Sequence, residues 1–396
     1  MEPTVTGEAK SGPLSGIRVI ELAGIGPAPF AGMMLADMGA DVIRVDRAEQ
    51  AASGAMRATH RVLDRGRRSI ALNLKDPRGV DVVLSLVADA DVLLEGFRPG
   101  VTERLGLGPD IVLAGNPRLV YGRMTGWGQD GPRAATAGHD IAYIAVTGAL
   151  EPIAGSSGEP VPPLNMLGDF GGGGMIMAFG IAAALVHAQR TGQGQVIDAA
   201  IVDGTALFTG MLHGLRAAGF WNAPRGHNVA DGGAPYYGTF KTADGKWVAA
   251  GAIEPQFFAE LVHGLGLDDD LPVSMQQDRN SWPHQRQLIA DAFAQRTRDE
   301  WVAAFENTDA CVAPVLSPIE AASDPHMAAR GSFREYDGVL HPAPAPRLTG
   351  TPGAWPGPAP MIGEHTREIL EMIGRTGAEI DGLFASGTAV QRDLPR

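Results

Sequence analysis

Short apolar runs with strand character alternate with stretches of helical spacing along the first third of the chain, and this alternation constrains the fold most. Residues 17–23, IRVIELA, and 41–46, DVIRVD, contain β-branched side chains and predict two buried strands, with a helix over 27–39 between them. The same alternation continues through residues 70–124. Strands separated by helices are typical of a parallel, doubly wound sheet, so we expect an α/β fold.

The region from about Trp221 has a different pattern and predicts a second domain. Residues 238–250 predict a β-hairpin with its turn at Asp244-Gly245. Three helices are expected to follow, over residues 255–264, 282–295 and 298–307, the last with the capping-box pair Thr297 and Glu300.

The last part of the chain predicts a return to the first domain. Residues 341–360 are rich in proline and glycine and predict an extended connector. Helices are expected after it, at 365–374 and near 379–384.

Charge and cysteine content exclude several classes of function. Lys and Arg number 32 against 45 Asp and Glu, a net charge of −13, which argues against a nucleic-acid partner because phosphate binding needs clustered cations. The single cysteine, Cys311, excludes a disulfide framework and a cysteine-rich metal site, and the scattered histidines make any metal site unexpected.

The distribution of apolar residues predicts a cytoplasmic protein with no membrane insertion. The first twelve residues are polar and lack the apolar core of a signal peptide. The longest uncharged apolar stretch, residues 170–188, contains five glycines and is barely long enough to span a bilayer, so a buried helix is expected there.

The glycines after the first strand imitate a dinucleotide-binding fingerprint. They form Gly24-Ile-Gly26-Pro-Ala-Pro29, and Asp46 lies about where a ribose-binding acid stands in such proteins. The third glycine position is Pro29, which blocks the close helix–strand contact that glycine allows. We therefore do not expect an NAD site.

Two ionisable residues stand at expected helix starts. His139 opens one predicted helix, where the helix dipole disfavours the imidazolium form and a neutral ring can act as a base. Asp169 precedes four glycines, whose exposed amides at a helix start could hold an oxyanion. Each residue also has an ordinary interpretation, a capping or core histidine and an N-cap aspartate.

Glu254 and several arginines are weaker signals. Glu254 stands just before Pro255 at a predicted helix start, where a carboxylate is ordinarily a cap. Arginines at or after strand ends are reasonable phosphate ligands in an acidic chain, although any single one can be a solvated surface residue. These arginines are Arg44, Arg47, Arg98 and Arg104.

Long motifs in the chain resemble those of the family III CoA-transferase superfamily. They are PLSGIRVIELAGIGPAPFAGMMLADMGADVIRVDR, EGFRPGVTERLGLG, RMTGWGQDGPR, GQVIDAAIVDG and GEHTREIL. Other segments are similar to the α-methylacyl-CoA racemase branch, namely GHDIAY, PLNMLGDFGGG, APRGHNVADGGAPYY, GAIEPQF and TDACVAPVL. The resemblance covers the chain from Pro13 to about Leu370.

The resemblance implies specific roles for residues of this chain. The family's acid/base groups match His139, in GHD, Asp169, in GDFGG, and Glu254, in AIEP. Its CoA-binding arginines match Arg47, Arg98 and Arg104.

The resemblance also implies an architecture. It is an interlinked, ring-like homodimer whose active site lies between the large domain of one subunit and the small domain of its partner. The large Rossmann-like, CoA-binding domain would comprise residues 1–200 and 335–396, followed by a linker helix over 201–224 and a smaller α+β domain over 225–334.

The implied reaction is inversion of the α-carbon of 2-methylacyl-CoA thioesters, an isomerase reaction of fatty acid metabolism. A base removes the α-proton and an acid on the other face returns one, roles that His139 and Asp169 can exchange, with Glu254 orienting His139. Amides near Asp169 and the glycine run would stabilise the enolate. No cofactor or metal is expected, since CoA is part of the substrate.

Two other functions fit parts of the pattern. A CoA transferase would use Asp169 as a nucleophile through an acyl-aspartyl anhydride and would need neither His139 nor Glu254. A non-catalytic acyl-CoA-binding protein would keep the arginines and need none of the three ionisable residues.

Overall fold

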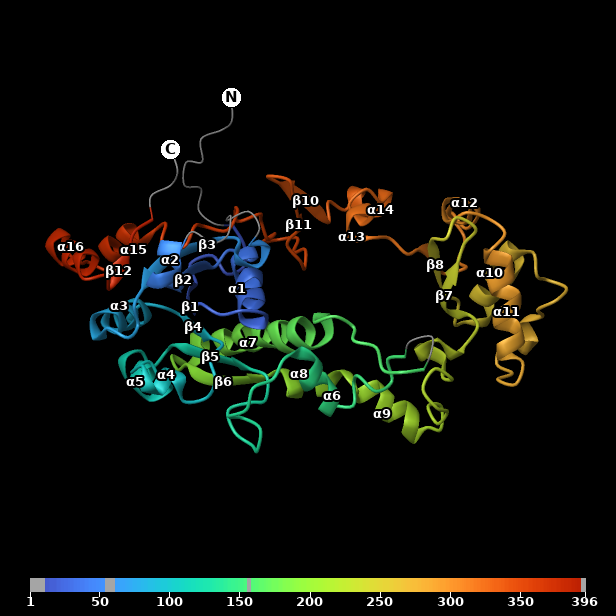
Figure 1. Ribbon diagram of the computed structural model, residues 1–396, viewed down its shortest axis with the longest axis horizontal. Coiled ribbons are helices and arrows are strands. Elements are labelled where there is room, and N and C mark those ends of the chain that lie inside the picture. The colour runs from blue at the N-terminus through green and yellow to red at the C-terminus, as the bar shows by residue number, and fades with distance from the viewer. Residues whose placement is uncertain (1–10, 54–60, 155–157, 393–396) are drawn as a thin grey trace, which may run out of the picture. The chain divides into compact units, whose positions relative to one another are not determined.

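A computed structural model describes residues 11–53, 61–154 and 158–392 and contains a seven-stranded sheet (Figure 1). The strand order is β12-β3-β2-β1-β4-β5-β6. Neighbouring strands are parallel except for the antiparallel edge pair β12–β3. The order 3-2-1-4-5-6 is that of doubly wound nucleotide-binding sheets, and the expected α/β fold is confirmed. The strands are β1 (Arg18–Leu22), β2 (Asp41–Arg47), β3 (Arg67–Leu72), β4 (Val92–Glu95), β5 (Val120–Thr125), β6 (Gln195–Ala200) and β12 (Ala389–Val390).

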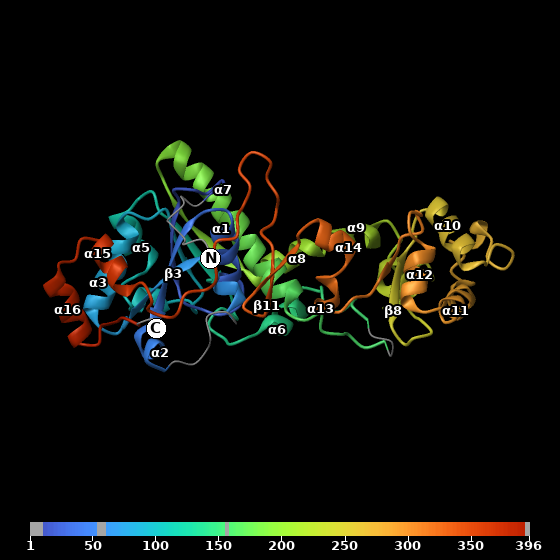
Figure 2. The same ribbon diagram turned by 90° about the horizontal axis from the view of Figure 1, so that it is seen from above.

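Helices cover both faces of this sheet. One face packs against α3 (Pro77–Ala88), α5 (Pro109–Gly115), α15 (Thr366–Met372) and α16 (Gly377–Ala385), which lie together in Figure 2. The other face packs against α1 (Pro27–Asp37) and α7 (Ile176–Thr191). Ile20 and Val19, adjacent in β1, point to opposite cores, as the two-residue period of a strand requires.

The C-terminal part of the chain is attached to the first strands. Beyond β10 (Phe333–Tyr336) and β11 (Val339–Pro342), the connector runs to Pro360 without a helix or strand. It is held to the sheet region by backbone hydrogen bonds from Ala354 N to Asp37 O, 3.2 Å, and from Gly66 N to Pro358 O, 3.4 Å. The final strand β12 then pairs with β3, so segments from both chain ends form one sheet.

The glycine run lies in a π-helix, η3 (Met166–Met175), that continues into α7. The prediction of exposed amides there is wrong, because Gly172, Gly173 and Gly174 are buried between neighbouring helices. A Cβ atom at Gly174 would come within 2.6 Å of the Phe30 ring, and one at Gly173 within 2.9 Å of Pro27. The glycines therefore permit close helix packing rather than contact with a ligand.

Among the described residues, the combined helix Met166–Thr191 is long and apolar enough to cross a membrane by length and composition alone. One side of α7 packs against the sheet through buried Met177, Ile181 and Leu185. This is the arrangement of a core helix.

The remaining described elements of this first unit are helical segments of three to eight residues. They are α2 (Ala48–Ser53), η2 (Val62–Asp64), α4 (Val101–Arg104), α6 (Asp140–Val146), α8 (Ile201–Phe208) and α14 (Pro325–Ala329).

A second compact unit contains a three-stranded antiparallel sheet and helices. The predicted hairpin is present as β7 (Tyr237–Lys241) and β8 (Trp247–Gly251), and β9 (Val312–Pro314) pairs with β8. Aromatic side chains such as Phe258, Phe293 and Trp301 form its core. Its helical segments are α9 (Gly210–Ala217), η4 (Val229–Gly233), α10 (Pro255–Leu265), η5 (Val273–Met275), α11 (Trp282–Phe293), α12 (Arg298–Ala304) and α13 (Pro318–Ala321).

The two units are assembled from alternating parts of the chain. The first combines residues up to Thr147, Leu164–Phe208 and residues from Pro325 onward, and the second combines Gly148–Pro163 with Thr209–Asp324. The segment 201–224, predicted as a linker helix, is divided between the units as α8 and α9.

Candidate active site

A cavity of about 470 Å³ lies at the carboxyl ends of β1 and β4. The strand order reverses between these two strands, and the loops that follow diverge there, which is where doubly wound sheets bind ligands. Residues 25–28 line one side and residues 96–99 line another. Both His139 and Asp169 line this cavity, so the fold brings together two of the three predicted acid/base residues.

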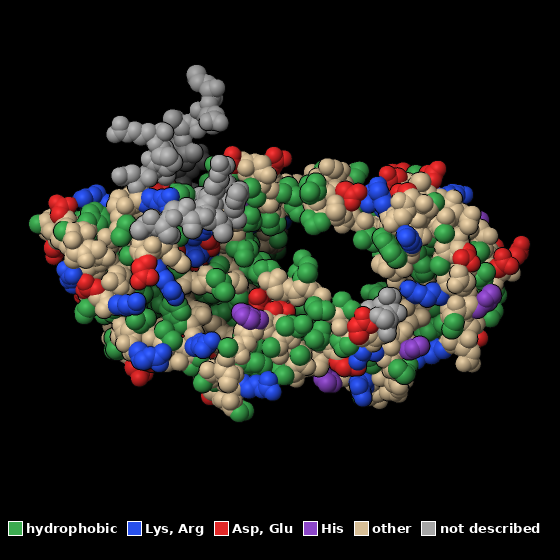
Figure 3. Space-filling view, viewed as in Figure 1, with side chains coloured by type: hydrophobic (Ala, Val, Ile, Leu, Met, Phe, Trp, Pro, Cys, Tyr) green, Lys and Arg blue, Asp and Glu red, His purple; other side chains and the backbone are tan. Residues whose placement is uncertain are grey.

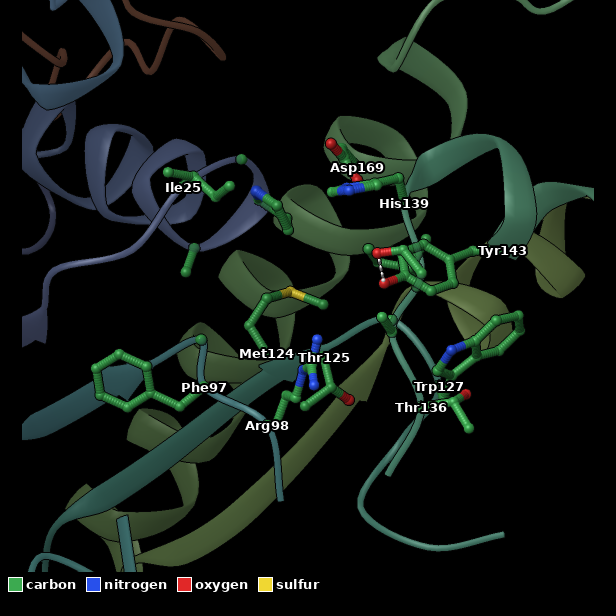
Figure 4. A pocket seen from close by; sticks show the side chains of 18 of the residues that line it. Ile25, Phe97, Arg98, Met124, Thr125, Trp127, Thr136, His139, Tyr143 and Asp169 are labelled. Carbon is green, nitrogen blue, oxygen red and sulfur yellow. Dashed lines mark hydrogen bonds between the residues drawn. The ribbon is translucent and has the colours of Figure 1, made fainter. Parts of the chain in front are cut away.

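His139 is the residue that precedes α6, with extended backbone angles φ −134° and ψ 168°. Its side chain makes no capping hydrogen bond, and its carbonyl accepts from Ala142 N at 2.8 Å. The side chain is thus exposed in the cavity and is not used to cap the start of the helix. Figure 4 shows His139 and Asp169 projecting into the same part of the cavity.

Asp169 lies inside η3, three residues after its first residue, so it is not the N-cap that the sequence suggested. Burial raises the pKa of the Asp169 carboxyl above its usual value. A hydrogen bond from Asn165 Nδ2, 3.3 Å long, opposes this rise, and the negative charge of Asp140 adds to it. A raised pKa makes the protonated form more accessible, which suits a group that must both give and accept a proton.

Asp140 connects the segments that carry the two residues. It follows His139 directly, and its Oδ1 accepts a hydrogen bond from the backbone N of Asp169 at 2.7 Å. A Cβ at Gly168 would collide with the Asp140 carboxylate, so glycine is needed beside it. The sequence prediction missed this residue, although its place in the GHD motif was a signal for it.

Gly26, which follows β1, has a structural role beside Asp169 that its resemblance to a dinucleotide fingerprint did not indicate. Gly26 has φ +71°, in the left-handed region, and a Cβ there would lie 3.3 Å from Asp169 Oδ2. Glycine therefore allows both the turn into α1 and the close approach of the carboxyl group.

Tyr143 supports the loop that carries His139. Its hydroxyl donates to the carbonyl of Gly138 at 2.5 Å, and its ring packs edge-on against Trp127 with centroids 4.8 Å apart. Burial raises the pKa of Tyr143, with the Asp169 charge adding to the rise and Arg98 opposing it. Arg98 thus lines the same cavity as the predicted bases and lies below them in Figure 4.

A second cavity of about 510 Å³ adjoins the first and shares Gly96, Phe97 and Arg98 with it. Arg47 and Lys75 also line it. Lys75 was missed by the sequence prediction, and its one ion pair, to Glu49, is exposed and 3.7 Å long.

The predicted CoA-binding arginines are free of acidic partners. The side chains of Arg47, Arg98 and Arg104 make no hydrogen bond or ion pair with the described part of the chain, whereas Arg44 and Arg67 are tied to buried carboxylates. Arg104 lines neither cavity, and its guanidinium lies against Gly100 in the turn before α4. An unpaired arginine can offer its whole charge to an anionic ligand.

Asp46, the acid considered for ribose binding, borders the second cavity, but its carboxylate is engaged by neighbouring side chains. It is 1% exposed and accepts hydrogen bonds from Arg44 Nε at 3.0 Å and Ser69 Oγ at 2.6 Å. These contacts tie it to Arg44 of the same strand and to Ser69 of β3.

Glu254 belongs to the second unit and precedes α10. It occupies the N-cap position of α10, as the sequence suggested, but its exposed carboxylate makes no capping hydrogen bond. The turn before it is fixed by Gln276, whose Nε2 donates to the carbonyls of Ala252 at 3.1 Å and Ile253 at 2.9 Å. The carboxylate is therefore held on a rigid turn and remains available.

The raised pKa of Asp169 predicts a stability effect for Asp169→Asn. Because the pKa in the folded state exceeds the unfolded value, ionisation at neutral pH opposes folding, and this cost vanishes below the unfolded pKa of about 3.9. We expect the asparagine variant to unfold at the same or a higher temperature than the parent at pH 7, with the difference closing toward pH ~4. A melting temperature several degrees lower at pH 7 would contradict this assignment.

The sequence matches CoA-transferase family III over residues 14–366. The chain belongs to this family. It is 49% identical over 375 residues to human α-methylacyl-CoA racemase and 47% identical over 370 residues to the mouse enzyme, covering 93% of this chain and 95% of each relative.

A solved structure agrees with the fold. The crystal structure of a CAIB/BAIF family protein from Brucella suis superposes with a TM-score of 0.80 at 26% identity, over 92% of this chain and all of that one. The resemblance to the family seen in the sequence motifs is confirmed. Family III members thus share the large, mostly parallel sheet at whose carboxyl edge the two cavities lie.

Proposed function

We propose that this member of family III is a racemase that inverts the α-carbon of 2-methylacyl-CoA thioesters. The observation that carries the proposal is the presence of two different proton-transfer groups, His139 and Asp169, in one cavity. Inversion needs a base on one face of the carbon and an acid on the other. The high identity to racemases from two mammals supports the same reaction.

The proposed steps conserve atoms and charge. One of the two groups takes the α-proton, the C–H electron pair enters the thioester as an enolate, and the other group returns a proton to the opposite face. The raised pKa of Asp169 helps it to hold the proton that it must deliver in one direction. Nothing in these steps calls for a cofactor beyond the CoA of the substrate.

The enolate oxygen needs a hydrogen-bond donor as charge develops. The buried amides of the glycine run are unsuitable, and the amide of Asp169 already donates to Asp140. We assign the donor to the backbone amide of Asp140, which follows His139 and makes no hydrogen bond within the described residues.

CoA would extend from the second cavity to the first, past the residues that both share. Its phosphates would meet Arg47, Lys75 and Arg98, and its thioester would lie beside His139 and Asp169. Arg104, on the same short helix as the cavity-lining Val101, would then lie near the CoA end of this path.

Arg47→Ala and Arg98→Ala are expected to raise KM more than they lower kcat. Contacts to phosphates far from the reacting carbon bind the ground state and transition state alike, and each charged contact is worth about 1.5–3 kcal/mol, or roughly 10- to 150-fold. Steady-state kinetics with an intact CoA thioester and with its pantetheine fragment measure the effect, which should shrink for the fragment.

Arg118→Ala is a matched control, because Arg118 is exposed and lines neither cavity. An unchanged KM in both cavity variants would remove these arginines from the binding site.

We further propose a homodimer in which Glu254 of one subunit completes the site of its partner. The first unit carries large apolar side chains that are exposed on α6, α7 and α8, and exposed apolar surface is typical of an interaction site. Figure 3 shows hydrophobic side chains among the surface atoms. The exposed side chains include Ile141 and Val146 on α6, Phe179 on α7, and Leu207 and Phe208 on α8.

Co-expression of a His139→Ala chain with a Glu254→Ala chain tests the shared site. In a two-fold dimer with random pairing, half of the molecules are mixed, and each mixed dimer has one site with both lesions and one intact site. About a quarter of all sites should then be wild type. Activity no greater than the sum of the two variants, with mixed dimers verified by tags, would exclude a shared site.

The acceptor requirement separates the racemase from a CoA transferase of the same family. A transferase that uses Asp169 as a nucleophile must pass CoA to an acceptor acid, whereas a racemase exchanges the α-hydrogen with solvent unaided. We expect deuterium to enter the α-carbon of a 2-methylacyl-CoA without any acceptor. Transfer of CoA to an added acceptor acid, with no deuterium entering the α-carbon, would support the transferase.

A further inference from the structure

A cavity of about 1040 Å³ in the second unit is lined by none of the residues to which the proposed reaction assigns a role. Every described residue that lines it belongs to that unit. Its walls include the aromatic side chains of Tyr237, Trp247 and Trp282 and the cationic side chains of Arg279 and Arg286.

Arg286, on α11, has an unusual environment for a charged residue. It is half-buried, and burial lowers the pKa of its guanidinium with no opposing contribution from any carboxylate. Its one hydrogen bond within the described chain runs from Nη1 to the carbonyl of Gly232 at 2.9 Å. Its guanidinium carbon also lies 5.2 Å from the centre of the Phe240 ring.

Other arginines of the same unit have the carboxylate partner that Arg286 lacks. Arg298 is paired with Glu320 at 2.9 Å, and Arg225 is paired with Glu151 at 2.6 Å. Arg286 is partly withdrawn from water without such a partner, so an anion beside it would offset the cost of its desolvation.

The local geometry leaves one edge of this guanidinium free. Nε and Nη2 make no hydrogen bond with described residues, and together they form the fork that binds a carboxylate through two parallel bonds. A Cβ at Gly238 would lie 3.1 Å from Nη1 and 3.2 Å from Nη2, so glycine there keeps space for the group.

The neighbouring charges favour a singly charged anion. Arg279 lies 5.2 Å from the Trp282 ring centre and adds a second positive charge to the wall. Asp231 also lines the cavity, but its carboxylate is occupied by the backbone amides of Gly226 at 2.9 Å and Asn228 at 2.8 Å. Its negative charge disfavours a phosphate dianion more than a carboxylate.

We propose that this cavity binds an organic monocarboxylate, with its charged end on Arg286 and its apolar or aromatic body against Trp282, Trp247 and Tyr237. This cavity is lined by residues of the second unit, whereas the two cavities of the proposed CoA path are lined by residues of the first. Large cavities with mainly apolar walls and a few polar groups are typical of small-molecule sites.

Calorimetric titration of the full-length protein with 3-phenylpropionate tests the proposal, with the neutral 3-phenylpropanamide as comparison. We expect the acid to bind at least about tenfold more tightly than the amide, and Arg286→Met to remove most of that difference. Arg279→Met, at an exposed side chain, is expected to weaken acid binding by a smaller factor.

Arg98→Met is the matched control, because it removes an arginine from the cavities of the other unit. It should leave the affinity for the acid unchanged. Equal affinities for acid and amide, an unchanged affinity in Arg286→Met, a loss in Arg98→Met, or stronger competition by inorganic phosphate than by acetate would each overturn the proposal. If Arg286→Met fails to fold, the acid–amide comparison and Arg279→Met decide.

Discussion

Racemisation is expected to fall at least about 100-fold in His139→Ala and in Asp169→Asn, because each variant lacks one of the two groups that must act on opposite faces of the carbon. Both side chains line the same cavity, and neither is used to cap a helix. The measurement is the initial rate of inversion for each enantiomer of a 2-methylacyl-CoA. Circular dichroism and melting temperature show whether each variant remains folded.

Each variant should still exchange the α-hydrogen of one enantiomer of the substrate. The surviving base can still remove the α-proton of the enantiomer that faces it, so deuterium should enter that enantiomer and not the other. The two variants should prefer opposite enantiomers. Equal exchange from both enantiomers in both variants would indicate a single base that serves both faces.

Arg67→Met is expected to lower the free energy of unfolding by about 3–5 kcal/mol, since it leaves a buried carboxylate without its main partner. Arg67 and Glu21 have fully buried side chains, with a contact of 2.8 Å between Nη2 and Oε2. Arg67 also donates to the carbonyls of Leu63 and Pro29, both at 2.5 Å. Urea denaturation measures the loss.

The loss should depend on pH with a definite sign. Burial raises the pKa of Glu21, and the Arg67 charge opposes that rise. Without Arg67 the pKa in the folded state rises further, so the penalty is largest at neutral pH and shrinks as pH falls toward the unfolded pKa of about 4.3. The difference between variant and parent should therefore narrow on acidification.

Arg68→Met, the next residue in β3, is the matched control. Arg68 pairs with Asp41 and Glu368 at 2.7 and 2.8 Å, but all three side chains are partly exposed. Exposed pairs contribute about 0–1 kcal/mol. A loss as large as that of Arg67→Met would show that burial is not the cause.

The sequence predicted the central strands well because their apolar runs are buried on both faces, as in β1 and β4. It missed β6, Gln195–Ala200, whose first four residues are polar or partly exposed at the sheet edge. It also missed β12, whose two residues are too few to show a period.

The sequence predicted which residues form the candidate site, but it did not predict the contacts that hold them in place. His139 and Asp169 were found from motifs, but spacing cannot reveal that Asp140 ties their segments together through a bond across 29 positions. The glycine run was misinterpreted because glycine serves equally for ligand approach and for helix packing, and only the positions of Pro27, Phe30 and Thr205 decide between them.

The isotope content of the first inverted product tests the two-base proposal most directly. One enantiomer of a 2-methylacyl-CoA is incubated with the wild-type protein in D₂O, and early samples are separated by chirality and analysed by mass spectrometry. If a second, solvent-equilibrated acid supplies the proton, the inverted enantiomer carries deuterium from the first turnover. An inverted product that retains the substrate's own hydrogen would contradict proton delivery by two separate groups, and the absence of any inversion would contradict the racemase itself.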